Sequence, residues 1–161
     1  MQEIVNKEHE QLIRHLKGVR RVVINNCHGG FSLSHRAVQA YLDKLGLVHW
    51  VEKDDKFKSL DMSTYWLVPP EERVNGSPDN WNDMTLAERQ AHNAAYSKQT
   101  FHDRDLDRDD PYLVSVVEEL GNEANGKYSE LKIVEIPADV DWYIEEYDGS
   151  EWVAEKHRTW R

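Results

Sequence analysis

The chain has 161 residues, and its 20 Lys and Arg against 30 Asp and Glu give a formal net charge of −10. This length fits one domain with a buried core, and 39% hydrophobic residues with six Trp argue against a disordered chain. A single Cys excludes an intrachain disulfide, and no apolar run is long enough to span a bilayer. The charged N-terminal residues argue against secretion, so we expect a cytoplasmic protein with no membrane partner.

The N-terminal part of the chain predicts a helical extension, followed by a strand, a glycine loop and a helix. In chain order, the expected elements are an extension over 1–18 that contains an amphipathic helix over 3–17, a buried strand over 20–25, and a helix over 35–45. Ser34 is a suitable N-cap for the last helix, and Gly29 with Gly30 allows the tight connection before it.

The middle of the chain predicts two strands and a surface excursion. In chain order, we expect strands over 47–51 and 63–68, a turn-rich insertion or flap over 69–100, and within it a short helix from 85 to about 96. Thr85 and Glu88 have the spacing of a capping box. We interpret residues 69–100 as an addition to one domain of residues 1–161.

The last third predicts a helix and a small sheet. In chain order, we expect an extended segment over 101–109, a helix over 111–120, a strand over 131–136, and two hairpin strands over 140–147 and 151–157. Asp110 before Pro111 is typical of a helix start, and Asp148-Gly149 is typical of a hairpin turn of two or three residues. The sequence therefore predicts a single α+β domain with a mainly antiparallel C-terminal sheet, packed helices and an N-terminal strand–glycine loop–helix unit. The strand at 21–25 is expected to add to this sheet in parallel.

Three stretches of the chain are distinctive. They are VINNCHGGFSLS from Val23, RDDP from Arg108 with VVEELG from Val116, and IPADVDWYIEEYDGSEWVAEKHRTW from Ile136. Together they resemble a family of small uncharacterised proteins encoded by tailed bacteriophages and prophages. The resemblance implies a protein made in the infected or lysogenic cell, and it implies no particular activity.

The first candidate site is the connection over 26–33, which we call the glycine loop. Backbone N–H groups at the start of a helix favour anions, and the side chains near this loop supply amides, hydroxyls, a thiol and an imidazole. The expected ligand-binding residues are Asn25, Asn26, Cys27, His28, Gly29, Gly30, Ser32 and Ser34. Three interpretations stay open here: a tight turn with a packed Cys27, a site for a small anionic ligand, or a nucleophilic thiol at a helix start.

The acidic segment over 103–110 is expected to form the opposite wall of this site. If it is extended, four of its carboxylates share one face and its two arginines the other, the four being Asp103, Asp105, Asp107 and Asp109. The ligand-binding residues expected here are Asp103, Arg104 and Asp105. The carboxylates suit Mg²⁺ or Ca²⁺, but a solvated edge segment is the simpler interpretation, and we expect no metal, cofactor or catalytic residue.

Charge is unevenly distributed along the chain. Residues 1–100 contain 13 acidic and 13 basic side chains, whereas residues 101–161 contain 17 acidic and 7 basic ones. Direct binding to nucleic acid is disfavoured, because it relies on Lys and Arg at the phosphates. The acidic surface either keeps the protein soluble or docks on a basic partner.

The sequence therefore predicts a non-catalytic binding protein. It would act on a basic host protein through its acidic face, or on a small anionic ligand at the Gly29-Gly30 loop. Two alternatives are a small hydrolase or transferase that uses Cys27 with nearby carboxylates, and a virion or assembly component. Aromatic residues in the C-terminal hairpin pack in the core or anchor a partner: Trp142, Tyr143, Tyr147, Trp152 and Trp160.

Overall fold

The computed structural model describes residues 18–53, 63–76 and 78–157. The chain forms two compact units, one of residues 1–45 with 103–161 and the other of residues 46–102. The predicted α+β class is confirmed, because α-helices combine with strands that pair antiparallel throughout the described residues. The helix predicted over 3–17 and the aromatic residue Trp160 lie outside these residues. In the described part of the chain, no helix has the length and apolar character needed to cross a membrane.

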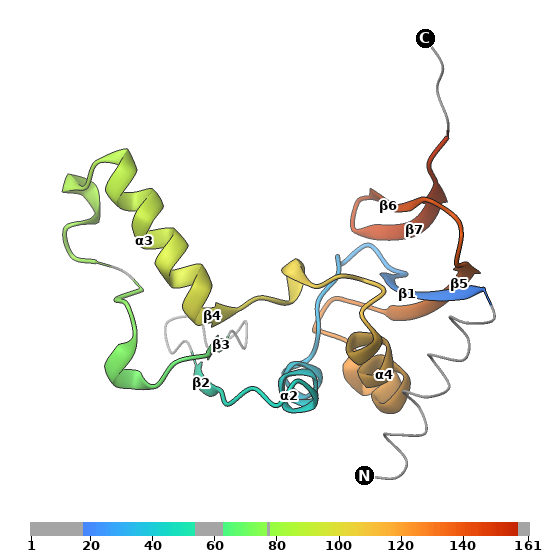
Figure 1. Cartoon of the computed structure of the whole chain (residues 1–161), viewed down its shortest axis with the longest axis horizontal. Coiled ribbons are helices and arrows are strands. Elements are labelled where there is room, and N and C mark those ends of the chain that lie inside the picture. The colour runs from blue at the N-terminus through green and yellow to red at the C-terminus, as the bar shows by residue number, and fades with distance from the viewer. Residues whose placement is uncertain (1–17, 54–62, 77, 158–161) are drawn as a thin grey trace. The chain divides into compact units, whose positions relative to one another are not determined.

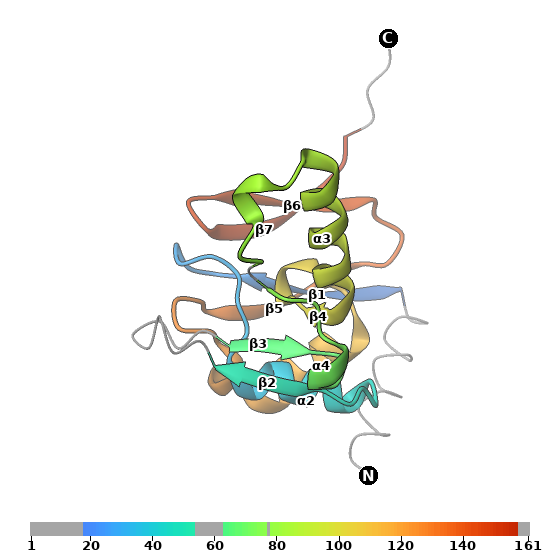
Figure 2. The same ribbon diagram turned by 90° about the vertical axis from the view of Figure 1, so that its left-hand side faces the viewer.

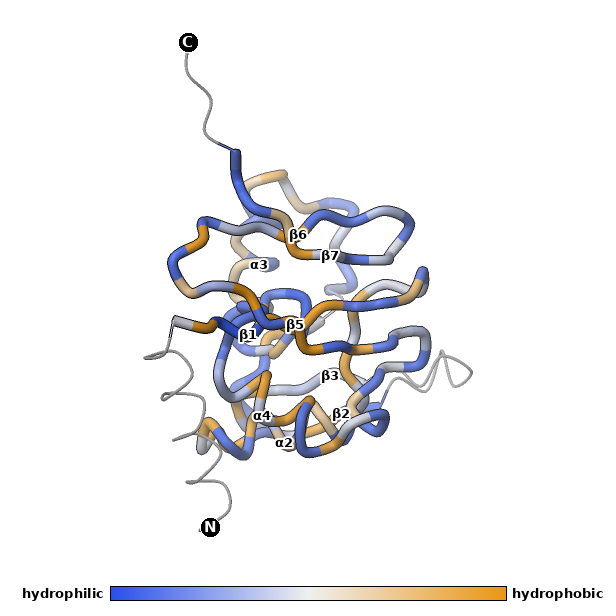
Figure 3. Tube along the Cα trace, turned by 90° about the vertical axis from the view of Figure 1, so that its right-hand side faces the viewer, coloured by the Kyte–Doolittle hydropathy of each residue, from blue (hydrophilic) through white to orange (hydrophobic). Residues whose placement is uncertain are grey.

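The first unit has three layers (Figures 1 and 2). The middle layer is the pair β1 (Val19–Asn25) and β5 (Leu131–Pro137), one outer layer is α2 (His35–Lys44) with α4 (Pro111–Leu120), and the other is the hairpin β6 (Trp142–Tyr147) and β7 (Ser150–Glu155). Hydrophobic stretches gather on α4 and the β1–β5 pair (Figure 3). Because β1 is covered on both faces, its apolar run is continuous, and both Val22 and Val23 are fully buried.

Local capping explains where α2 and α4 begin. The Ser34 hydroxyl accepts a hydrogen bond from the Ala37 backbone N–H at the start of α2. The Asp110 carboxylate accepts from two backbone N–H groups of the first turn of α4, where Pro111 needs no hydrogen-bond acceptor. Both predicted helix starts are confirmed.

The direction of β1 differs from the prediction. We expected the strand at 21–25 to add in parallel, but β1 pairs antiparallel with β5, with Val22 opposite Val134. The cause lies at the end of β1, where the Asn26 N–H donates to the Glu130 carbonyl and the Glu130 N–H donates to the Asn25 side chain. These bonds hold the start of β5 beside the end of β1, so β5 must run back along it.

The C-terminal hairpin is confirmed, and its turn has two residues. Tyr147 pairs with Ser150 across the turn. Asp148 and Gly149 both have positive φ, 51° and 83°, as the twist of a two-residue hairpin turn requires.

The acidic segment is not extended, contrary to the prediction. Residues Asp103–Asp105 form a turn of 3₁₀-helix, so the carboxylates do not alternate along a strand. The Asp103 carboxylate accepts a hydrogen bond of 2.9 Å from the Leu33 backbone N–H, which fixes the segment to the glycine loop. This bond bends the chain here. It joins residues far apart in the sequence, so the alternation of residues along the segment could not predict it.

The second unit contains the predicted excursion over 69–100. Its elements are β2 (Trp50–Lys53), β3 (Ser63–Trp66), 3₁₀ turns at Pro70–Glu72 and Trp81–Asp83, α3 (Leu86–Gln99) and β4 (Thr100–Phe101), with strand order β2-β3-β4. The Thr85–Glu88 capping box is confirmed. Buried Trp66 organises the unit: its indole N–H donates to Glu52, and the Tyr96 ring packs edge-on against it.

Candidate functional site

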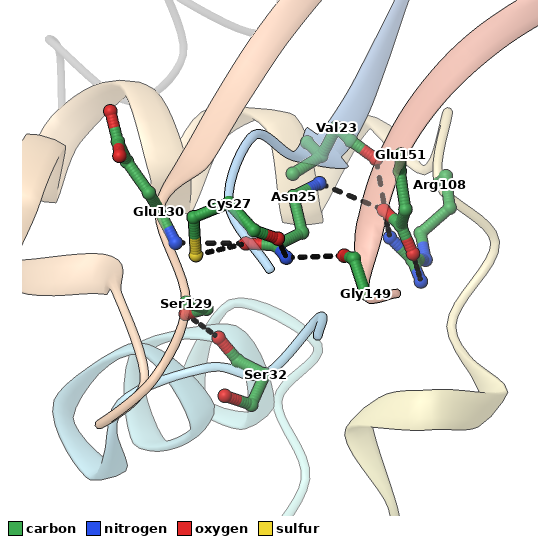
Figure 4. A network of polar contacts seen from close by, with 9 residues as sticks. All are labelled: Val23, Asn25, Cys27, Ser32, Arg108, Ser129, Glu130, Gly149 and Glu151. Atoms are coloured by element: carbon green, nitrogen blue, oxygen red, sulfur yellow. Dashed lines mark hydrogen bonds and ion pairs between the residues drawn. The ribbon is translucent and has the colours of Figure 1, made fainter. Parts of the chain in front are cut away.

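Asn25, the last residue of β1, is fully buried. Its polar contacts form the centre of a network beside the glycine loop (Figure 4). Its side-chain N–H₂ donates to the carbonyls of Cys27 and Gly149, both at 2.6 Å. Its side-chain oxygen accepts from the Glu130 N–H at 2.8 Å, and its own backbone N–H donates to the Glu151 carboxylate at 2.8 Å. Asn25 therefore joins three segments: the loop, the start of β5 and the hairpin turn.

Arg108 and Glu151 form the second part of this network (Figure 4). Their two N–O distances are 2.9 and 3.0 Å, and the side chains are 16% and 8% exposed. The guanidinium also donates to the Val23 carbonyl and lies 3.3 Å from the Phe31 ring centre. The sequence by itself did not predict this pair. Its only trace in the sequence is the position of the two residues, with Arg108 before the N-cap of α4 and Glu151 just after the hairpin turn.

Three of the residues expected to bind a ligand contact the chain itself, through the Ser34 hydroxyl, the Ser32 backbone carbonyl and the Asp103 carboxylate. Ser34 donates to the Glu123 carbonyl at 2.6 Å in addition to capping α2. The Ser32 carbonyl accepts from the Ser129 hydroxyl at 2.7 Å. Asp103 is brought to the loop through Leu33, as described above, whereas Arg104 and Asp105 are exposed.

Close backbone packing explains two of the glycines. A Cβ on Gly29 would lie 1.5 Å from the Tyr128 carbonyl oxygen. A Cβ on Gly149 would lie 2.6 Å from both the Gly30 nitrogen and the His28 carbonyl oxygen. These contacts support the tight-turn interpretation of the loop, and a ligand there stays a prediction.

The remaining loop residues give no constellation for a reactive thiol. The half-buried Cys27 thiol donates to the Tyr128 carbonyl at 3.2 Å and contacts the Asn25 side-chain oxygen at 3.4 Å. His28 and Asn26 are exposed, and the His28 ring lies 3.9 Å from Asp148. Among the described residues, no group of three or more His, Cys, Asp or Glu could hold a metal ion.

The outer face of the hairpin is a second candidate site, which sequence reasoning identified only as a set of aromatic residues. Strand alternation separates this face from the one toward β1. We call it the aromatic–acidic face, and its members are Tyr143, Glu145, Tyr147 and Trp152. Tyr147 is 73% and Trp152 is 44% exposed, so much of their ring surface is open.

Glu145 is held in place by two aromatic donors. The Tyr143 hydroxyl donates to one carboxylate oxygen, and the Trp152 indole N–H donates to the other at 2.7 Å. Both bonds lower the pKa of Glu145, and the bond from Tyr143 has the larger effect. The bond between Tyr143 and Glu145 also raises the pKa of Tyr143. The carboxylate is therefore charged and oriented at neutral pH.

The surroundings of this face are strongly acidic. Residues 138–157 contain seven Asp and Glu and one Lys. Two of the carboxylates have cationic partners: Glu151 binds Arg108, and Asp141 binds Lys156 at 3.2 Å. The hairpin therefore presents a net negative surface.

The two candidate sites differ in what their polar groups do. At the glycine loop these groups mainly join segments of the chain, whereas the aromatic–acidic face presents an oriented carboxylate beside exposed rings. No protein-family model, no curated protein and no solved structure matches the chain.

Proposed function

We propose that the protein is a non-catalytic binding protein that docks on a basic partner protein through the aromatic–acidic face. One observation carries this proposal: Tyr143 and Trp152 hold the Glu145 carboxylate in a fixed position on an exposed surface. Exposed aromatic side chains often contribute most of the energy of a protein interface. An oriented carboxylate also binds at a lower entropic cost than a mobile one.

Charge complementarity supports a basic partner. The net negative surface of residues 138–157 attracts a positive surface, increases the rate of encounter and disfavours acidic partners. Following the resemblance to phage and prophage proteins, the partner is a protein of the infected or lysogenic cell.

The contacts at the glycine loop favour a partner at the aromatic–acidic face over a small anionic ligand at the loop. The Leu33 N–H, which precedes α2, already binds the Asp103 carboxylate, itself an anion. The Ser34 hydroxyl likewise serves the backbone of α2 and of Glu123. An anionic ligand would compete with both.

Photo-crosslinking in cells tests the proposed function. A photoreactive phenylalanine replaces Tyr147 on the aromatic–acidic face or, as the control, Leu86 in the second unit, which is 72% exposed and so matches it. We expect the Tyr147 probe to form an adduct with a distinct protein at a Lys- or Arg-rich surface. The purified pair should then bind, with an affinity that falls as salt concentration rises.

The charge dependence of this binding provides a second test of the proposed function. Glu145→Gln should weaken the purified complex, because it removes the oriented charge without changing the size of the side chain. Identical adducts from the probes at Tyr147 and Leu86, or a complex that is insensitive to both salt and Glu145→Gln, would contradict the proposal.

A further inference from the structure

The second unit shows how a tryptophan–glutamate pair in this chain takes an arginine. The Trp66 indole N–H donates to Glu52 at 2.7 Å. The Arg73 guanidinium then lies 4.9 Å from the Trp66 ring centre and 3.4 Å from the same Glu52 oxygen. One arginine thus contacts both the ring and the carboxylate that the ring orients.

The aromatic–acidic face repeats the first two members of this arrangement. The Trp152 indole N–H donates to Glu145 at 2.7 Å, with the two residues directly opposite each other in the β6–β7 pair. Here the second donor to the carboxylate is the Tyr143 hydroxyl rather than an arginine. The face therefore has a tryptophan and an oriented glutamate like those that bind Arg73 in the second unit, but on an exposed surface.

Glu145 keeps the capacity to accept further hydrogen bonds. A carboxylate offers about four acceptor positions. Its two aromatic donors occupy one position on each oxygen, because Tyr143 binds one oxygen and Trp152 the other. A donor group that reaches both oxygens at once therefore fits better than a single donor.

The residues that flank Trp152 and Glu145 on this face are aromatic or small. Tyr143 and Tyr147 are diagonal neighbours of Trp152, and the residues opposite the two tyrosines, Ala154 and Ser150, are small. Diagonal positions on one face lie about 7–8 Å apart. At that separation long and aromatic side chains still reach one another, so an arginine that stacks on Trp152 can also contact a tyrosine ring.

These features select a guanidinium over an ammonium. A guanidinium is planar, donates two parallel hydrogen bonds to one carboxylate and stacks on aromatic rings, whereas an ammonium is a compact, strongly hydrated charge. Resting on the proposed function, we infer that the aromatic–acidic face binds an arginine side chain of the basic partner, paired with Glu145 and stacked on Trp152. Arg108 makes the same combination of contacts inside the first unit, where it pairs with Glu151 over the Phe31 ring.

Two capped peptides that differ only in their cations provide the test: acetyl-GRGRG-amide and acetyl-GKGKG-amide. The full chain is titrated with each to about 10 mM while the ¹H–¹⁵N signal of the Trp152 indole is followed by NMR, with Trp152→Phe assigning that signal. We expect the arginine peptide to shift this signal and to bind at least about fivefold more tightly than the lysine peptide.

Matched variants locate the effect on this face. Glu145→Gln should abolish the preference for arginine. Glu155→Gln makes the same charge change on the same hairpin but on the opposite face, and it should leave the preference intact. A preference that survives Glu145→Gln would overturn the inference.

The remaining outcomes separate this inference from the proposed function. Equal binding of the two peptides would overturn the choice of arginine and leave a basic partner in place. Binding of neither peptide would also overturn the inference, and the crosslinking experiment would then decide the proposed function by itself.

Discussion

Arg108 and Glu151 bind each other through two hydrogen bonds, 2.9 and 3.0 Å long, although 43 residues separate them in the chain. The same carboxylate accepts the backbone N–H of Asn25 at the end of β1. The pair thus connects the segment before α4 with the hairpin and the middle layer. Together with the bond from the Asn25 side chain to the Gly149 carbonyl, this pair supports the orientation of the hairpin and of the aromatic–acidic face.

Removing one partner of this pair should strongly destabilise the first unit. Arg108→Met leaves the buried Glu151 carboxylate without its cation, and breaking a buried pair in this way costs about 3–5 kcal/mol. The control Lys156→Met breaks the exposed pair with Asp141, which is worth about 0–1 kcal/mol. Urea unfolding followed by tryptophan fluorescence measures both changes. Equal losses of stability in the two variants would show that the buried pair has no special role.

Two neighbouring glycines should respond differently to alanine. Gly30 has φ +84° with nothing within 4 Å of an added Cβ, so Gly30→Ala should cost only the strain of a left-handed backbone, about 1–2 kcal/mol. Gly29 has no such φ, but its Cβ would overlap the Tyr128 carbonyl, so Gly29→Ala should cost about 3 kcal/mol or more. Thermal and urea unfolding rank the two variants. A more stable Gly29→Ala than Gly30→Ala would contradict the packing of the loop.

The Glu145 carboxylate should keep its charge to a lower pH than an ordinary glutamate. Its hydrogen bonds from Tyr143 and then Trp152 lower the pKa below the usual 4.5. Because the folded-state pKa is depressed, the stabilisation is present above pH 4.5 and is lost as pH falls through the lowered value. Carboxyl ¹³C NMR should therefore find a higher titration midpoint for Glu145 in Tyr143→Phe than in the unsubstituted protein. An unchanged midpoint would mean that the hydroxyl does not bind the carboxylate in solution.

The thiol should be dispensable. Cys27 acts through a weak hydrogen bond to the Tyr128 carbonyl, which a serine hydroxyl can also donate. We expect Cys27→Ser to retain both the folded circular dichroism spectrum and the affinity for the partner. Complete loss of binding with folding intact would restore the hypothesis of a chemically active cysteine.

Features with a local cause could be predicted from the sequence alone. Asp110 with Pro111 determined the start of α4, Ser34 that of α2, and Thr85 with Glu88 that of α3, because a cap acts over three or four residues. Asp148-Gly149 determined the hairpin for the same reason. The alternation of β6 and β7 then placed aromatic residues on one outer face, although sequence alone did not show which of them are exposed.

Only the tertiary structure decided the features that depend on distant residues. The antiparallel direction of β1 follows from bonds between Asn25, Asn26 and Glu130, and the bent acidic segment follows from the bond between Asp103 and Leu33. Each of these contacts spans a long stretch of chain, and periodicity carries no information about which distant groups meet. The sequence by itself thus determined where helices and turns form. The packing of the layers determined which polar groups are used inside the protein and which, like the Glu145 carboxylate, remain at the surface, where we propose that a partner binds.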